Sequence, residues 1–252
     1  MGLQIGDIVP RKAVEFSELK GKVIAVDAFN AIYQFLSSIR QPDGTPLMDN
    51  HRRVTSHLSG LFYRNISLLS EGIKLIYVFD GEYHVLKGKT REIRESAKAA
   101  ASERYERARE EEDVEAMGKY ARGMTRISAE MIEESKELLE AMGVAVVQAP
   151  SEGEMQCAEL VKRDEAWAGG SQDYDALAVG GKRLIQNLTL ARRRKTVSGQ
   201  VYISPEIIEY GGVLNLLGID PDQLICLAIL VGTDFNPGGV SGIGPKKALA
   251  LV

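Results

Sequence analysis

Short runs of apolar, often β-branched residues recur along the chain and alternate with stretches that have a helical hydrophobic period. The runs at 22–28 (KVIAVDA), 73–80 (IKLIYVFD) and 143–147 (GVAVV) predict buried strands. Residues 30–39 and 54–70 place apolar side chains at every third or fourth position, which predicts two amphipathic helices. Strands that alternate with helices indicate an α/β fold with a mainly parallel central sheet and helices on both faces.

Residues 87–140 have dense charge of both signs, no proline and few large apolar side chains. This composition predicts one or two solvated helices that project from the core. Lys87, Arg91, Arg94 and Lys98 follow one another at helical spacing and form a basic stripe along one face. A surface helix with mixed ion pairs is the alternative interpretation.

The rest of the chain predicts further helices. Residues 128–140, 205–217 and 220–231 have amphipathic or strongly apolar helical patterns. Gly-Pro-rich turns then lead into a last helix that the end of the chain leaves unfinished.

Seven acidic residues stand out by their place at or near the ends of these elements. They are Asp27, Asp80, Glu152, Glu154, Asp173, Asp175 and Asp234. Asp27 and Asp80 end two strand runs, while Asp173 and Asp175 are two residues apart, which in an extended segment puts both on one face. Because ligands of parallel sheets bind at the carboxyl ends of the strands, we expect the acids to gather there.

So many like charges share a pocket only when cations neutralise them, since each carboxylate raises the pKa of its neighbour. Hard divalent ions with oxygen ligands meet that need, and Mg²⁺ is the usual ion where phosphates take part. Two such ions about 4 Å apart activate a water and stabilise the leaving oxygen of a phosphodiester. Singly, the acids also have structural interpretations: Ser151 and Glu154 fit a capping box, Asp80 precedes a turn glycine, and Asp27 ends a strand.

Composition narrows the possible functions. The 252 residues include 44% hydrophobic and 26% charged residues, as in an ordinary globular protein, and no apolar run reaches the roughly 20 residues that span a bilayer. Two cysteines and three scattered histidines argue against a zinc site of His and Cys. The formal charge of −4 argues at first against nucleic acid as a partner. With the seven acids set aside, however, the remaining residues are mildly basic.

The segment GIGPKKA is a Gly-x-Gly turn that opens the last helix. Gly242 and Gly244 let backbone N–H groups approach a phosphate, and Lys246 and Lys247 add positive charge at the helix N-terminus. Such a turn holds one DNA strand without reading its bases. A plain connector between two helices is the alternative interpretation.

Taken together and in order, these motifs resemble the structure-specific 5′-nuclease family, most closely the flap endonucleases of the archaeal type. The matching segments are VDAFNAIYQFLSSIRQPDGTPL (26–47), SHLSGLFYRNI (56–66), YVFDG (77–81), APSEGEMQCA (149–158), SQDYDAL (171–177), LVGTDFNPGG (230–239) and GIGPKKA (242–248). The resemblance implies a PIN-like 5′-nuclease fold in one catalytic domain over 1–252. It also implies a helical arch at about 84–128 and a helix–two-turn–helix at about 220–252.

The resemblance implies roles for particular residues. The seven acids would hold two Mg²⁺ ions, with Mn²⁺ as a substitute, and a monovalent cation would lie near the helix–two-turn–helix. Lys87 and Arg94, at the base of the arch, would contact the scissile phosphate and stabilise negative charge. Tyr33 would stack on the nucleotide beside the scissile bond, and the backbone of Gly2 would lie near the active site. Further DNA contacts are expected from Arg40, Arg64, Gly242, Gly244, Lys246 and Lys247.

The implied activity is that of a flap endonuclease and 5′–3′ exonuclease that hydrolyses DNA phosphodiesters in replication and repair. Its partner would be branched DNA with a 5′ flap. It is expected to be a monomer, and to be cytoplasmic in an archaeal source or nuclear in a eukaryotic one.

This chain departs from the family in two places. Tyr83 and His84 stand where the family usually carries a proline pair. Relatives also continue beyond the equivalent of Val252 to a tail that binds a sliding clamp, so the chain is expected to be a fragment. Two other functions stay open: a DNA-binding module that is inactive in this form, and a metal-dependent phosphatase with Asp173 and Asp175 as nucleophile and acid.

Overall fold

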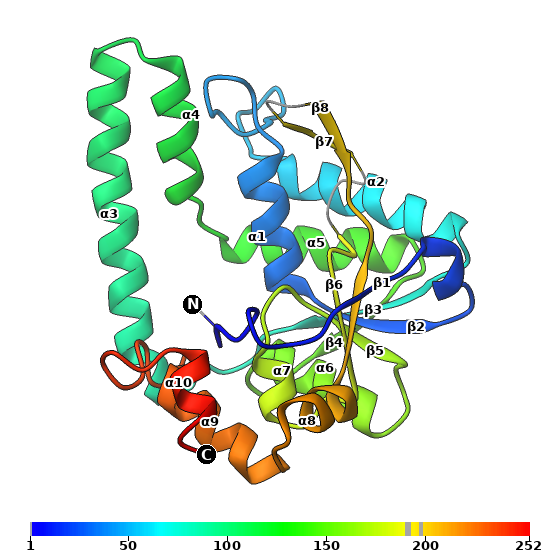
Figure 1. Cartoon of the computed structure of the whole chain (residues 1–252). Helices are drawn as coiled ribbons and strands as arrows, with labels where there is room; N and C mark the ends of the chain where they lie inside the picture. The colour runs from blue at the N-terminus through cyan, green and yellow to red at the C-terminus, as the bar shows by residue number, and fades with distance from the viewer. Residues whose placement is uncertain (1, 190–192, 197–198) are drawn as a thin grey trace.

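A seven-stranded sheet forms the middle layer of the protein in the computed structural model, which describes residues 2–189, 193–196 and 199–252 (Figure 1). In spatial order the strands are β1 (Lys12–Ala13), β9 (Glu206–Glu209), β6 (Arg183–Gln186), β5 (Ala168–Gly170), β2 (Val23–Asp27), β3 (Lys74–Phe79) and β4 (Ala145–Gln148). The strands from β6 to β4 are parallel, whereas β9 is antiparallel to β6, and β1 to β9. The prediction of a mainly parallel sheet is confirmed.

The three predicted strand runs correspond to β2, β3 and β4. Side chains of β2 alternate between two hydrophobic clusters, because successive residues of a strand point to opposite faces. Ile24 and Val26 pack into one cluster and Ala25 into the other. In β3, Tyr77 and Val78 divide in the same way. Both faces of these central strands are therefore buried.

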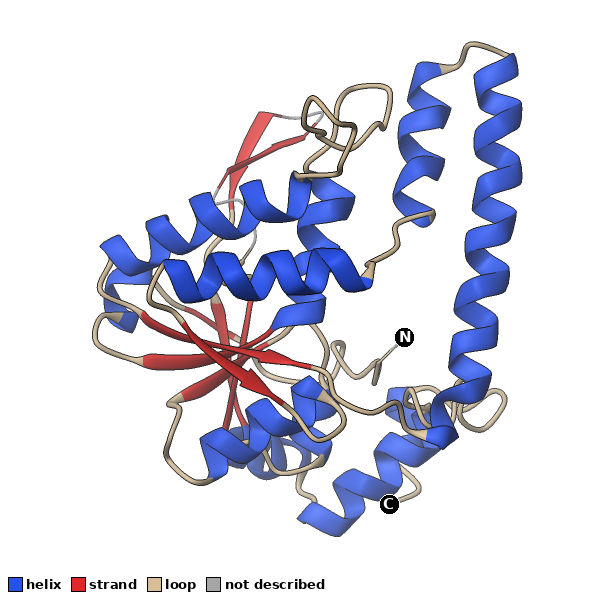
Figure 2. Ribbon diagram, turned by 180° about the vertical axis from the view of Figure 1, so that it is seen from behind, coloured by secondary structure: helices blue, strands red, loops and turns tan. Residues whose placement is uncertain are grey.

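Helices cover both faces of the sheet, as Figure 2 shows. One face carries α1 (Ala28–Ser38), α2 (Ser56–Ser70) and α5 (Ala129–Ala141), which bury Ile32, Leu61 and Leu139 against the sheet. The other face carries α6 (Gly153–Lys162), followed by α7 (Asp175–Ala178), α8 (Tyr210–Leu217), α9 (Pro221–Val231) and α10 (Pro245–Leu249). Short 3₁₀ helices span Phe16–Leu19 and Val85–Lys87, and β7 (Arg193–Thr196) pairs with β8 (Gly199–Tyr202) in a separate hairpin.

Helices α3 (Gly88–Glu110) and α4 (Val114–Gly123) project from the body of the molecule (Figure 1). The charged composition of this region predicts such solvated helices, and along α3 only Thr90 and Ala108 are buried. The chain then returns through residues 124–128 to α5, so the two ends of this projection join the body at different places.

The prediction of a helix at 205–217 is partly wrong. Residues Glu206–Glu209 form strand β9, and the helix begins at Tyr210. Ile208 is fully buried opposite Leu184 of β6, so antiparallel pairing decides the conformation of a segment whose local pattern continues into the helix.

No single helix in the described part of the chain is long and apolar enough to cross a membrane. The pair formed by α8 and α9, bent by 83° between them, meets the criterion on length and composition alone.

The contact between α1 and α2 gives a test of the packing. A Cβ atom at Gly60 of α2 would lie 2.2 Å from Cγ of the buried Phe35 ring, whereas a Cβ at Gly211 of α8 would meet no atom within 4 Å. We expect Gly60→Ala to lower the free energy of unfolding by about 1–3 kcal/mol through overpacking. Gly211→Ala should raise it by about 0.5–1 kcal/mol through lost chain entropy. Urea unfolding of both variants measures this contrast, and stabilisation by Gly60→Ala would contradict the packing.

Candidate active site

Asp27 and Asp80 lie at the carboxyl edge of the sheet, where the neighbouring strands β2 and β3 end. Asp27 caps α1, since its Oδ1 accepts a hydrogen bond from the backbone N–H of Asn30 at 3.1 Å. Asp80 Oδ1 accepts from the N–H of Gly153 at 2.7 Å. A Cβ atom at Gly153 would come within 2.8 Å of that oxygen, so glycine permits this close approach. The strand ends place both carboxylates where the sequence predicts them.

The start of α6 brings two more acids to this edge. Glu152 is the N-cap residue of α6, and Glu154 lies in its first turn. Glu154 Oε1 accepts a hydrogen bond from the N–H of Ala176 at 3.2 Å, so its carboxylate reaches across to α7. The alternative interpretation of Ser151 and Glu154 as a capping box is wrong, because the helix begins one residue later and Ser151 Oγ donates to the Glu82 carbonyl at 3.0 Å.

Asp173 and Asp175 face the N-terminal segment of the chain. Asp175 Oδ1 accepts from the N–H of Leu3 at 2.7 Å, and Asp173 Oδ2 accepts from Asn30 Nδ2 at 3.2 Å. A Cβ atom at Gly2 would lie 3.0 Å from a carboxylate oxygen of each acid. The prediction that this pair lies in an extended segment is wrong, since Asp175 begins α7. A turn followed by a helix nevertheless keeps both carboxylates beside Gly2.

Lys87 and Arg94 from the base of the projecting helix α3 reach the acids. Arg94 Nη2 donates to Asp234 Oδ2 at 2.5 Å. Lys87 Nζ donates to Glu152 and lies 3.5 Å from Asp234 Oδ2. Burial lowers the pKa of Lys87, but the hydrogen bond and charge of Glu152 outweigh it and leave that pKa raised. The helix thus supplies two cations to an edge that holds many anions.

Burial, with added repulsion between neighbouring carboxylates, changes the protonation of these acids. Burial raises the pKa of Asp27 to about 7, and the charge of Asp80 adds to the effect. Burial also raises the pKa of Asp80, Asp173 and Asp175, and that of Glu154 well above its ordinary value, with nearby carboxylates contributing to each. Asp234 is the exception. Burial raises its pKa, but nearby positive charges, among them Arg94 and Lys87, lower it overall. These acids therefore form one electrostatic unit.

The donor set suits hard divalent cations, because it consists of carboxylate oxygens that burial has deprived of water. In residues 2–189, 193–196 and 199–252, no group of three acids already surrounds a common point as metal ligands do. Lys87 holds Glu152, and Arg94 holds Asp234. An ion that binds three of these acids would have to draw their carboxylates together, and it would compete with Lys87 for Glu152 and with Arg94 for Asp234.

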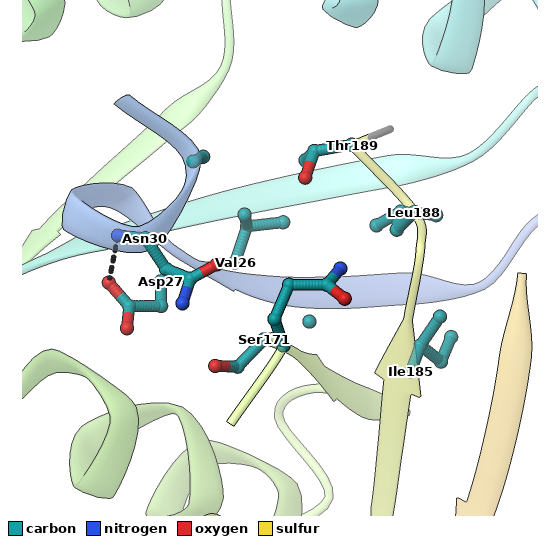
Figure 3. Close-up of a pocket in the computed structure, with 10 residues that line it drawn as sticks. Val26, Asp27, Asn30, Ser171, Ile185, Leu188 and Thr189 are labelled. Atoms are coloured by element: carbon teal, nitrogen blue, oxygen red, sulfur yellow. Dashed lines mark hydrogen bonds between the residues drawn. The ribbon is translucent and has the colours of Figure 1, made fainter. Parts of the chain in front are cut away.

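Asn30 is a residue of this site that the sequence did not single out. Its backbone N–H binds Asp27 and its side-chain amide binds Asp173, so it joins acids that are far apart in the chain. A small hollow next to Asp27 is lined by Asn30, Ser171 and Thr189 among others (Figure 3). Its side-chain partner Asp173 is 143 residues away in the chain, so no local pattern signals this role.

The residues expected to contact DNA do not all lie near the acids. Tyr33 on α1 is 42% exposed. Arg40, beyond the other end of α1 from Asp27, donates to the carbonyls of Leu36 and Gly44 at 2.7 Å each and to Thr125 Oγ1 at 2.9 Å. These hydrogen bonds tie the end of α1 to the segments at Gly44 and Thr125, and burial lowers the pKa of Arg40.

Arg64 is partly buried in the middle of α2. The GIGPKKA turn lies before and in α10: Gly244 is the N-cap residue, Gly242 has a φ of +78°, and Lys246 and Lys247 are exposed. Lys247 Nζ donates to the Gly242 carbonyl at 3.1 Å, which closes the turn on itself. The DNA contacts of these residues stay predictions.

Comparison with known families agrees with this geometry. Residues 4–101 match the XPG N-terminal domain, and residues 143–234 match the XPG I-region. The two matched ranges contain all seven acids together with Lys87 and Arg94. The chain therefore has the fold and the conserved regions of the XPG class of nucleases.

Within that class the chain belongs to the flap endonuclease 1 family. Flap endonuclease 1 of Aeropyrum pernix is 53% identical over 257 residues, which cover 100% of this chain and 73% of the relative. The Pyrococcus furiosus protein of the same name is 53% identical over 254 residues, covering 100% and 75%. Among solved structures, flap endonuclease-1 from Methanococcus jannaschii has 45% identity and a TM-score of 0.77, with 99% of this chain and 76% of that one covered.

A more distant relative was solved together with DNA. The catalytic core of Rad2 in complex with DNA substrate has 28% identity and a TM-score of 0.72, and the match covers 100% of this chain and 67% of that one.

The raised pKa of Asp27 predicts how stability depends on pH without divalent ions. Between about pH 4 and pH 7 the folded protein keeps a proton on Asp27 that the unfolded chain has lost. The contribution of Asp27 to the free energy of unfolding therefore falls as the pH rises through this range, and it stays constant above about pH 7. Asp27→Asn keeps the shape and removes the charge. In EDTA, the free energy of unfolding of this variant relative to the unsubstituted protein should rise with pH by up to roughly 3 kcal/mol.

Asp27→Asn must be compared with the unsubstituted protein at each pH, because His57 changes the pH dependence of the free energy of unfolding in the opposite direction. Burial lowers its pKa, so its contribution to stability grows as the pH rises, equally in both proteins. Chemical unfolding at pH 4.5, 6 and 7.5 measures the difference. A difference in the free energy of unfolding that stays constant over this pH range would contradict the raised pKa of Asp27 at the sheet edge.

Proposed function

We propose that this chain cuts branched DNA at a phosphodiester near the base of a 5′ flap, and acts from 5′ ends as an exonuclease, using two divalent metal ions. One observation carries the proposal. Acids from separate segments of the chain gather at the carboxyl edge of the sheet, and two cations of a projecting helix contact them. Membership of the flap endonuclease 1 family and the DNA-bound Rad2 relative support DNA as the substrate.

The metal ligands we propose are the seven acids of the sheet edge: Asp27, Asp80, Glu152, Glu154, Asp173, Asp175 and Asp234. Bound Mg²⁺, or Mn²⁺ in its place, would supply an activated water and charge stabilisation at the leaving oxygen. Lys87 and Arg94 would then be free of their carboxylate partners. Both side chains reach Asp234 Oδ2 in the structure, so once released their N–H groups would be available to the oxygens of the scissile phosphate, which makes them the proposed catalytic cations.

The DNA would be held outside the acid cluster. Helices α3 and α4, within the proposed arch at about 84–128, would flank the single-stranded flap. The segment at about 220–252, proposed as a helix–two-turn–helix, would grip the downstream duplex through its turn, with a monovalent cation nearby. Exposed Tyr33 would stack on a base, and the backbone of Gly2 would line the site.

Other parts of the proposal rest on the resemblance alone. They are a single catalytic domain over 1–252, a monomeric state, a sliding clamp as a further partner, and a cytoplasmic location in an archaeal source or a nuclear one in a eukaryotic source. For Arg40 a DNA contact would use the guanidinium N–H groups that are not already bound to Leu36, Gly44 and Thr125.

Removing one proposed ligand tests the function. We expect Asp80→Ala and Asp175→Ala each to lower Mg²⁺-dependent cleavage of a 5′-labelled flap by about 100-fold or more, since an ion supplies several kcal/mol to the transition state. Affinity for the same DNA, measured by fluorescence anisotropy, should stay within a few-fold. Glu165→Ala removes an exposed acid between α6 and β5 and serves as the matched control.

Three results would contradict the proposal. They are near-normal cleavage by both variants, binding of the flap without cleavage by the unsubstituted chain, and release of phosphate from a small monoester while flap DNA stays intact. The second result would favour a DNA-binding module, and the third a phosphatase.

A further inference from the structure

Thr90 is a buried polar residue on a helix that is otherwise almost entirely exposed. It is 3% exposed, and Ala108 is the other buried residue of α3. Ala108 lies near the far end of the helix, whereas Thr90 lies in its first turn, where α3 meets the segment after α9. The base of the projection is therefore fixed to the body of the protein at Thr90.

The contact that Thr90 makes is a hydrogen bond to the main chain of a proposed metal ligand. Thr90 Oγ1 donates to the backbone carbonyl of Asp234 at 2.6 Å, in a buried setting. A threonine inside a helix often returns its hydroxyl to a carbonyl of the preceding turn, but here the acceptor is 144 residues away. Because the acceptor is a backbone atom, the bond does not depend on what the Asp234 carboxylate binds.

Thr90 stands between the two cations of the site on the same face of the helix. Lys87 precedes it by three residues and Arg94 follows it by four, which are the spacings of neighbours along one helical face. Both cations reach the Asp234 side chain, at 3.5 Å and 2.5 Å. Lys87 Nζ also lies 5.2 Å from the centre of the Phe235 ring, so the residue after Asp234 adds to the contact.

We infer that Thr90 is a positioning residue. It sets the position of α3 along its axis and the rotation of α3 about that axis, so that Lys87 and Arg94 face the acids. This inference rests on the proposed function of those two cations. Metal ions and a phosphate would compete for the ion pairs of Lys87 and Arg94, and those pairs must exchange during a reaction. The Thr90 bond stays in place through that exchange and keeps the cations within reach.

The test compares Thr90→Val, which has the shape of threonine without its hydroxyl, with Thr90→Ser, which keeps the hydroxyl. Thr90→Val should lower the single-turnover rate of flap cleavage by about 10- to 100-fold, because small misplacement of catalytic groups has effects of that size. Its Kd for the flap should change by less than about 2-fold, and Thr90→Ser should restore the rate to within about 3-fold. Should Thr90→Val fail to fold, Thr90→Ala, which lets water reach the carbonyl, takes its place.

A second background shows whether Thr90 acts through the two cations. In a Lys87→Ala, Arg94→Ala protein, adding Thr90→Val should cause no further loss of rate, since residues that act as a unit are not additive. A wild-type rate in Thr90→Val, or an equal loss in both backgrounds, would overturn the inference.

Hydrogen exchange separates this inference from the proposed function. In the DNA-free protein, amides of residues 88–94 should exchange faster in Thr90→Val than in Thr90→Ser. If the unsubstituted chain does not cleave flaps, the proposed function fails, and the exchange result still decides whether Thr90 anchors α3. Equal exchange in the two variants would overturn the anchoring role.

Discussion

Repulsion among buried carboxylates at one edge of the sheet is the constraint that the surrounding structure meets. Burial and neighbouring charge raise the pKa of Asp27 to about 7 and also raise the pKa of Asp80, Glu154, Asp173 and Asp175, whereas the pKa of Asp234 is lowered. Asp234 differs because positive charges, Arg94 and Lys87 among them, lie against it. The positive charges of Lys87 and Arg94 thus offset part of the electrostatic free energy that it costs to bring carboxylates together at the ends of adjacent parallel strands.

This charge balance links parts of the fold that are far apart in sequence. The acids come from strand ends and helix starts that only the folded sheet brings together. The cations come from a helix that has few contacts of its own with the body, and Thr90 and the ion pairs hold its base. Divalent ions would take over the compensating role, and the same two cations would become available to a phosphate.

The sequence predicts those features that follow from local pattern. Runs of β-branched residues indicate β2, β3 and β4, and acids directly after such runs lie at the sheet edge in the structure. Prediction from local pattern fails where contacts between distant segments of the chain determine the conformation. The strand at Glu206–Glu209 depends on pairing with β6, and Ser151 binds the Glu82 carbonyl in place of capping a helix. The roles of Asn30 and Thr90 depend on partners more than 140 residues away, which no local pattern shows.

The most direct test of this account is a crystal structure of the protein soaked in Mn²⁺, with the ions located by anomalous scattering. The account predicts two ions among the carboxylates of Asp27, Asp80, Glu152, Glu154, Asp173, Asp175 and Asp234. It also predicts that Lys87 and Arg94 leave Glu152 and Asp234 while the Thr90 bond to the Asp234 carbonyl persists. Absence of ions from this edge at saturating Mn²⁺, with both ion pairs intact, would contradict it.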